Sequence, residues 1–126
     1  LEFRRVLFRS LPNCTAAEVT ERTAPLVQIL RKTRPSTPII LVEDRTYTDA
    51  FLVATKKDRN STSRAALKAE FNKLIAAGEK YLYYIQGETL LGADGDDTVD
   101  GSHPTDLGFV RQAEAMAMTL APLVGR

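Results

Sequence analysis

The sequence predicts an α/β fold with three α/β/α layers, in which a parallel sheet lies between helices. Two short, continuous apolar runs, at 39–43 and 81–85, have the length of buried strands. Helical segments precede, separate and follow these runs. Strands that alternate with helices imply right-handed crossovers, which make the strands parallel and place helices over both faces. With 44% hydrophobic and 26% charged residues in 126, the composition is that of one globular domain.

The first predicted helix runs from residue 15 to about residue 33. Thr15 and Glu18 form a capping box, because Thr15 can accept from the amide of residue 18 while Glu18 reaches back. Pro25 lies inside the segment and would clash with the preceding turn, so we expect a kink or a break there. The expected apolar face consists of Val19, Leu26, Val27 and Leu30.

The second predicted helix spans 61–80 and follows the strand at 39–43. Residues 44–60 between them lack periodicity and are expected to form a long loop with one helical turn. Gly78 is expected to cap the carboxyl end of the helix. Its expected apolar face consists of Leu67, Phe71, Leu74 and Ile75.

The last predicted helix runs from about 105 to 123. The segment 86–104, between this helix and the strand at 81–85, is rich in glycine and aspartate and is predicted to be a loop. The helix is expected to bury one face that consists of Leu107, Val110, Ala113, Ala117, Leu120 and Val124. In open parallel sheets the active site lies beyond the carboxyl ends of the strands, which is where this loop begins.

Charge and hydropathy narrow the possible partners. The formal net charge is +1, too small to indicate a nucleic-acid partner. No apolar run approaches the ~20 residues that a membrane-spanning helix needs. The single cysteine, Cys14, excludes an internal disulfide framework and leaves the compartment open.

Residues 1–10, LEFRRVLFRS, are expected to be an artefact. Written as the codons CTG GAG TTC AGA CGT GTG CTC TTC CGA TCT, they give the sense strand of a common sequencing adapter, and they do not resemble a signal peptide. The fold would then be truncated at its N-terminus, and residues 11–126 would be the C-terminal part of a longer domain. A genuine basic strand is the alternative.

The only histidine, His103, stands three residues after Asp100 in the stretch DGSHPTDLGF. An aspartate at this spacing on a tight turn can contact one imidazole nitrogen, which fixes the tautomer and stabilises the protonated ring. Gly101 and Ser102 would make the turn, and Pro104 would stiffen its exit. A solvated histidine on a surface loop is the alternative that the spacing alone leaves open.

These residues resemble a known family. DGSHPTDLGF resembles the last motif block of the SGNH (GDSL-like) esterases and lipases, and the stretch 11–47, LPNC to RTY, resembles the region after the third block in a bacterial branch of that family. The resemblance covers 11–126 and implies a flavodoxin-like SGNH hydrolase fold. It implies a serine esterase that cleaves acyl or carbohydrate esters of small molecules without a metal or organic cofactor.

The resemblance also implies roles for three residues. His103 matches the general base, Asp100 matches its orienting partner, and Asn13 matches the asparagine whose side-chain amide donates to the oxyanion. Pro12 stands where the family's flanking glycine is expected, so a turn or capping role for Asn13 stays open.

The family's nucleophile has no counterpart in the sequence. None of the five serines stands in a G-D-S context, namely Ser10, Ser36, Ser61, Ser63 and Ser102. We therefore expect the nucleophile and the second-block glycine to lie upstream of Leu11, and residues 11–126 alone to be inactive. Cys14 is a weaker candidate nucleophile, because a lone cysteine is usually a small buried residue.

Two acidic segments have other possible uses. The spacing in 94–101 partly resembles a calcium loop, but Thr98 stands at its fifth position and no glutamate closes it, which favours a flexible loop. The charged residues of 43–46 either line a substrate cleft or pair with one another. A non-catalytic binding module whose acidic loop holds a cation or polar ligand is the alternative function.

Overall fold

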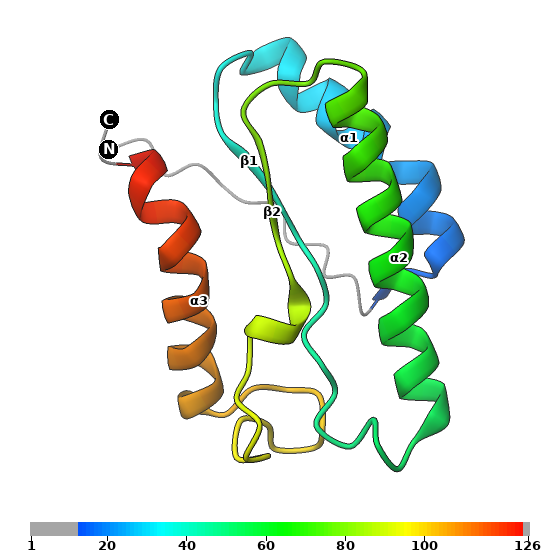
Figure 1. Cartoon of the computed structure of the whole chain (residues 1–126), viewed down its shortest axis with the longest axis vertical. Coiled ribbons are helices and arrows are strands. Elements are labelled where there is room, and N and C mark those ends of the chain that lie inside the picture. Colours follow the sequence, from blue (N-terminus) through cyan, green and yellow to red (C-terminus); the bar gives the residue numbers. More distant parts are fainter. Residues whose placement is uncertain (1–12, 125–126) are drawn as a thin grey trace.

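The computed structural model describes residues 13–124, so the expectation for 1–10 lies outside the described residues. The elements follow one another as α1 (Ala16–Thr33), β1 (Ile39–Val42), α2 (Ala54–Ala76), β2 (Leu82–Ile85), a short 3₁₀ turn η2 (Gly87–Thr89) and α3 (Asp106–Val124). The two strands pair in parallel, with Ile39 opposite Leu82 and Val42 opposite Ile85. In Figure 1, α1 and α2 lie on one side of the strands and α3 on the other. The predicted α/β/α layering is confirmed.

The capping box of α1 is present as predicted. The Thr15 hydroxyl accepts from the Glu18 amide at 3.2 Å, and the Thr15 amide donates to Glu18 Oε2 at 2.8 Å. Because the Thr15 groups bind the charged carboxylate, the pKa of Glu18 is lowered. Of the kink or break expected at Pro25, the break does not occur, since α1 continues through this residue.

The core lies between α1, α2 and the sheet. Val27, Leu74 and Leu82 form its buried centre. In α1 the buried positions are Val19, Thr23 and Val27, which recur every four residues and face α2. Val19 and Val27 are buried as expected, whereas Leu26 and Leu30, which we also expected to be buried, are exposed.

Helix α2 begins seven residues earlier than predicted. Its first turns carry Asn60, a polar residue that is buried because its side chain bonds to the segment after β1, a tertiary contact that periodicity cannot reveal. The end of the helix is as expected. Gly78 has a φ of +87°, its amide donates to Ile75 O, and the Glu79 amide donates to Leu74 O at 3.0 Å, which is a Schellman motif.

The predicted burial of one face of α3 is wrong. All six residues expected there are exposed, and the only fully buried residue of the helix is Gly108. Gly108 faces the loop that precedes the helix, and a Cβ at this position would lie 2.2 Å from the Asp97 carbonyl oxygen. The face that is half-buried differs from the predicted one and consists of Arg111, Gln112, Ala115, Met116, Thr119 and Leu123. No helix in 13–124 is long and apolar enough to cross a membrane.

Candidate active site

The stretch that carries Asp100 and His103 forms a closed turn at the carboxyl ends of β1 and β2 (Figure 1). An isolated antiparallel bridge joins Thr98 to Pro104. Inside it, the Val99 amide donates to His103 O at 2.9 Å, and outside it the Thr105 amide donates to Asp97 O at 2.8 Å. Gly101, at the tip, has a φ of +82°, a conformation that favours glycine. The turn is thus shaped by its own backbone.

Asp100 receives three hydrogen bonds within this turn. Its Oδ1 accepts from the amides of Ser102 and His103 at 2.9 and 2.8 Å, and its Oδ2 lies 2.7 Å from His103 Nδ1. These bonds hold the pKa of Asp100 well below its usual range, and the bond from the His103 amide has the largest effect. Because Nδ1 faces the carboxylate, Nε2 is the ring nitrogen left for proton transfer.

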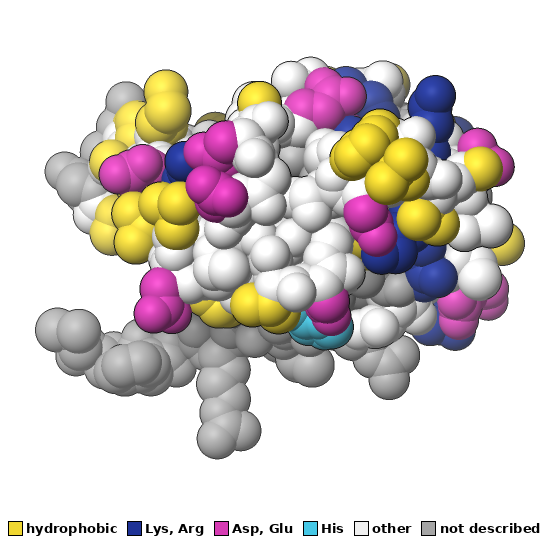
Figure 2. All heavy atoms as spheres, turned by 90° about the horizontal axis from the view of Figure 1, so that it is seen from below, with side chains coloured by type: hydrophobic (Ala, Val, Ile, Leu, Met, Phe, Trp, Pro, Cys, Tyr) yellow, Lys and Arg dark blue, Asp and Glu magenta, His cyan; other side chains and the backbone are white. Residues whose placement is uncertain are grey.

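The pair is open to solvent on its outer side. The side chains of His103 and Asp100 are 75% and 52% exposed. Figure 2 shows the histidine, in cyan, at the surface beside an acidic side chain. The imidazole is therefore accessible to a group brought by another part of the protein or by a substrate.

Asn13 comes from a separate part of the chain. It lies in the short turn that precedes α1, and its side chain is exposed. Cys14, which follows it, is a free, half-buried cysteine. The structure thus brings Asp100 and His103 into contact, while the third candidate belongs to the other end of the described chain.

The acidic loop is held by an arginine that the sequence analysis did not single out. Arg111 on α3 bonds both carboxylate oxygens of Asp94, at 2.8 and 2.6 Å, and Oδ1 of Asp97 at 2.7 Å. Asp97 is fully buried, and its Oδ2 accepts from the Gly92 amide at 2.7 Å. The arginine lowers the pKa of Asp94 well below its usual range. These contacts fix the base of the turn.

The charged residues after β1 pair with one another and with their surroundings. Glu43 accepts from the Tyr84 hydroxyl at 2.6 Å and from the Gly87 amide at 2.8 Å. Burial raises the pKa of Tyr84, and the hydrogen bond to Glu43 raises it further. Asp44 pairs with Arg45 at 3.3 Å, and burial raises the pKa of Asp44 despite that cation. Glu43, Asp44 and Arg45 thus each bond to other groups of the protein.

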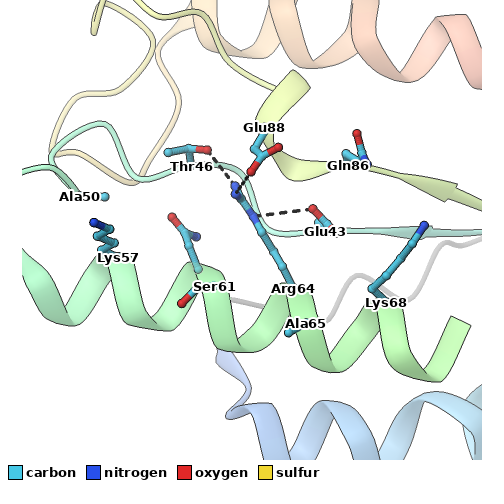
Figure 3. Close-up of a pocket in the computed structure, with 11 residues that line it drawn as sticks. Glu43, Thr46, Ala50, Lys57, Ser61, Arg64, Ala65, Lys68, Gln86 and Glu88 are labelled. Atoms are coloured by element: carbon cyan, nitrogen blue, oxygen red, sulfur yellow. Dashed lines mark hydrogen bonds and ion pairs between the residues drawn. The ribbon is translucent and has the colours of Figure 1, made fainter. Parts of the chain in front are cut away.

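A pocket of about 440 Å³, lined mostly by charged and polar residues, lies between α2 and the segments that follow the two strands (Figure 3). Arg64 crosses it, donating to Asp44 O and to the Thr46 hydroxyl, and pairing with Glu43 and Glu88. Lys57 and Lys68 lie along the same side of α2. Since Arg64 is fully occupied by protein groups, its first role is to join α2 to the strand ends.

Of the four described serines, Ser36 lies in the exposed turn between α1 and β1, and the other three are buried or bonded to other groups. Ser63 is buried in α2, the Ser61 hydroxyl donates to Asp58 O within the same helix, and the Ser102 hydroxyl bonds to Arg45. Across residues 13–124, no three histidine, cysteine or acidic side chains are grouped so that they could hold a metal ion.

Comparison with known proteins gives two findings. A model of the GDSL-like lipase/acylhydrolase family matches residues 4–121. A protein from Bacteroides ovatus ATCC 8483, assigned as a GDSL-like lipase and solved at 1.40 Å resolution, superimposes with a TM-score of 0.86 and 30% sequence identity. The match covers 91% of the present chain and 34% of that protein. No curated protein matches the chain.

Proposed function

The chain belongs to the GDSL-like lipase/acylhydrolase family, and on this basis we propose that it is part of a serine esterase that cleaves acyl or carbohydrate esters. In this proposal His103 is the general base and Asp100 orients it. The substrate is a small-molecule or carbohydrate ester, and the reaction needs no metal or organic cofactor.

The proposed reaction follows from the arrangement of the imidazole. A serine hydroxyl placed at Nε2 of His103 loses its proton to that nitrogen as its oxygen attacks the ester carbonyl. The ring then carries a positive charge, which the ionised Asp100 stabilises through Nδ1 at 2.7 Å. His103 returns the proton to the leaving alcohol, and a water activated in the same way releases the acyl group.

Asn13 is the proposed donor to the oxyanion. Its side-chain amide would bind the negative oxygen of the tetrahedral intermediate, an interaction worth about 3–4 kcal/mol of barrier for one donor. Asn13 lies in the exposed turn before α1.

The nucleophile is proposed to lie outside this sequence. None of the five serines stands in the family's G-D-S context. The chain also spans only about a third of the length of the similar protein, 34%. The upstream part would therefore supply the serine, and the described part supplies the base that activates it.

The observation that carries the proposal is the 2.7 Å contact between Asp100 Oδ2 and His103 Nδ1 on a loop at the carboxyl ends of the strands. The alternative of a binding module with a cation-binding acidic loop is weaker, because Asp94 and Asp97 already bind Arg111. Carboxylates neutralised by an arginine are poor cation ligands.

An active-site probe on the complete protein, with its upstream segment, tests the proposal. A fluorophosphonate should label one upstream serine, detected by mass spectrometry, and His103→Gln should abolish the labelling. Asp106→Asn, which changes an exposed aspartate in the first turn of α3, serves as the control and should label normally. Equal labelling of the His103→Gln protein would rule out His103 as the base.

A further inference from the structure

We propose that Arg45 is a positioning residue that holds the Asp100–His103 turn in place through Ser102. This inference rests on the proposed function for its catalytic meaning, while the contacts stand independently. Arg45 follows β1, and Ser102 lies between Asp100 and His103, 57 residues further along the chain.

The contact uses two donors of the guanidinium on one residue. Arg45 Nε donates to the Ser102 carbonyl oxygen, and its second terminal nitrogen bonds to the Ser102 hydroxyl at 2.9 Å. Two bonds to one residue fix both its position and its orientation. Because Ser102 is covalently joined to Gly101 and His103, fixing it also fixes the direction in which the imidazole leaves the backbone.

Contacts from neighbouring residues and from α2 hold Arg45 in place. Asp44, whose side chain is only 2% exposed, pairs with the guanidinium at 3.3 Å. The buried Asn60 of α2 donates to Arg45 O at 3.0 Å and accepts from the Tyr47 amide at 3.1 Å. Arg64 donates to Asp44 O at 3.0 and 2.9 Å. The support therefore runs from α2 through the end of β1 to the turn.

The catalytic pair needs such support because its own side chains are poorly packed. His103 is 75% exposed, so surrounding side chains do little to restrict its ring. A further long-range bond to the turn runs from the Thr48 amide to Gly101 O at 3.0 Å. A displacement of about 1 Å in a catalytic group can cost about 100-fold in rate. Arg45 is thus placed to set the rate through the position of His103.

The single histidine gives a direct readout that does not depend on activity. In the 126-residue chain with ¹⁵N-labelled histidine, at alkaline pH, the two ring-nitrogen shifts report which tautomer His103 adopts. The wild-type chain should show the Nδ1–H tautomer, because Nδ1 faces the Asp100 carboxylate. Arg45→Met should give a mixture of both tautomers.

Arg31→Met is the matched control. Arg31 is as buried as Arg45, with side chains 13% and 15% exposed, and it also bonds to backbone carbonyls, those of Thr37, Lys80 and Tyr81. It lies at the opposite ends of the strands, so its loss should leave the His103 tautomer unchanged. A mixture in the Arg31→Met chain would mean that any loosening of the fold has this effect, and would overturn the proposal.

Arg45→Lys keeps the positive charge beside Asp44 but lacks the planar guanidinium with its several donors. Its share of the second His103 tautomer should therefore lie between those of the wild-type chain and Arg45→Met. If Arg45→Met does not fold, as judged by circular dichroism, this variant decides the question. A wild-type tautomer in either folded Arg45 variant overturns the proposal.

Kinetics on the complete protein separate this inference from the proposed function. Arg45→Met should lower kcat by about 10- to 100-fold and leave KM within about twofold, since the turn positions the base and not the substrate. An unchanged kcat in an active enzyme contradicts the positioning role. If the wild-type protein cleaves no ester while the tautomers respond as expected, the proposed function fails and the positioning role stands.

Discussion

Replacing Asp97 by asparagine tests whether the base of the turn is held by a buried charge. Asp97 Oδ1 accepts from Arg111 and Oδ2 from the Gly92 amide, both at 2.7 Å, and the side chain is fully buried. Asparagine has the same shape but only one acceptor. Its amide NH₂ must therefore face one of the two donors, in a place where water does not reach it.

The cost follows from these contacts. A buried donor without an acceptor costs about 1–3 kcal/mol, and the bond to Arg111 loses the charge that strengthens it. We therefore expect the free energy of unfolding to fall by about 2–3 kcal/mol. For a domain of this size that lowers Tm by roughly 10 °C.

Thermal unfolding of the 126-residue chain, followed by circular dichroism, measures this change. Asp94→Asn is the matched control, because Asp94 binds the same arginine but its side chain is 46% exposed. Its replacement should lower Tm only slightly, as for other exposed ion pairs. Equal losses in the two variants, or a Tm for Asp97→Asn within about 2 °C of wild type, would refute the reasoning from burial.

Three further predictions concern the turn and the chain. Gly101→Ala should lower the free energy of unfolding by at least about 1–2 kcal/mol in urea titrations, from the left-handed backbone alone. A Cβ there would also lie 2.6 Å from the Asp49 carboxylate, so an unchanged midpoint would contradict the turn geometry. The pKa of Asp100 is lowered in the fold, so its stabilisation is present above its ordinary pKa of about 4 and is lost as pH falls further. The Tm difference between wild type and Asp100→Asn should accordingly shrink at acidic pH, and a difference that grows there would be contrary to this assignment. The 126-residue chain alone should hydrolyse p-nitrophenyl acetate no faster than buffer, and turnover that is lost in His103→Gln would show that the chain contains its own nucleophile.

The local features of the fold could be predicted because their causes are local. The capping box needs only Thr15 and Glu18, and the Schellman motif needs a glycine at position 78. The two strands were found from continuous apolar runs, and the contact between Asp100 and His103 spans three residues. In each case the interacting groups lie within one turn or one strand.

The errors arose where burial is decided by distant segments. The apolar residues of α3 suggested a buried face, yet Arg111 and Gly108 determine which side of the helix meets the loop. Helix α2 starts early because Asn60 bonds to the segment after β1. Arg45 and Ser102 are 57 residues apart, and no spacing rule connects them. Single-sequence patterns carry no information about such pairs.

The steady-state rate of p-nitrophenyl acetate hydrolysis by the complete protein and its His103→Gln variant tests the account most directly. If His103 is the base held by Asp100, the variant should lose at least about 10³-fold in kcat/KM while its circular dichroism spectrum is unchanged. A folded His103→Gln protein that hydrolyses the ester at the wild-type rate would contradict the account.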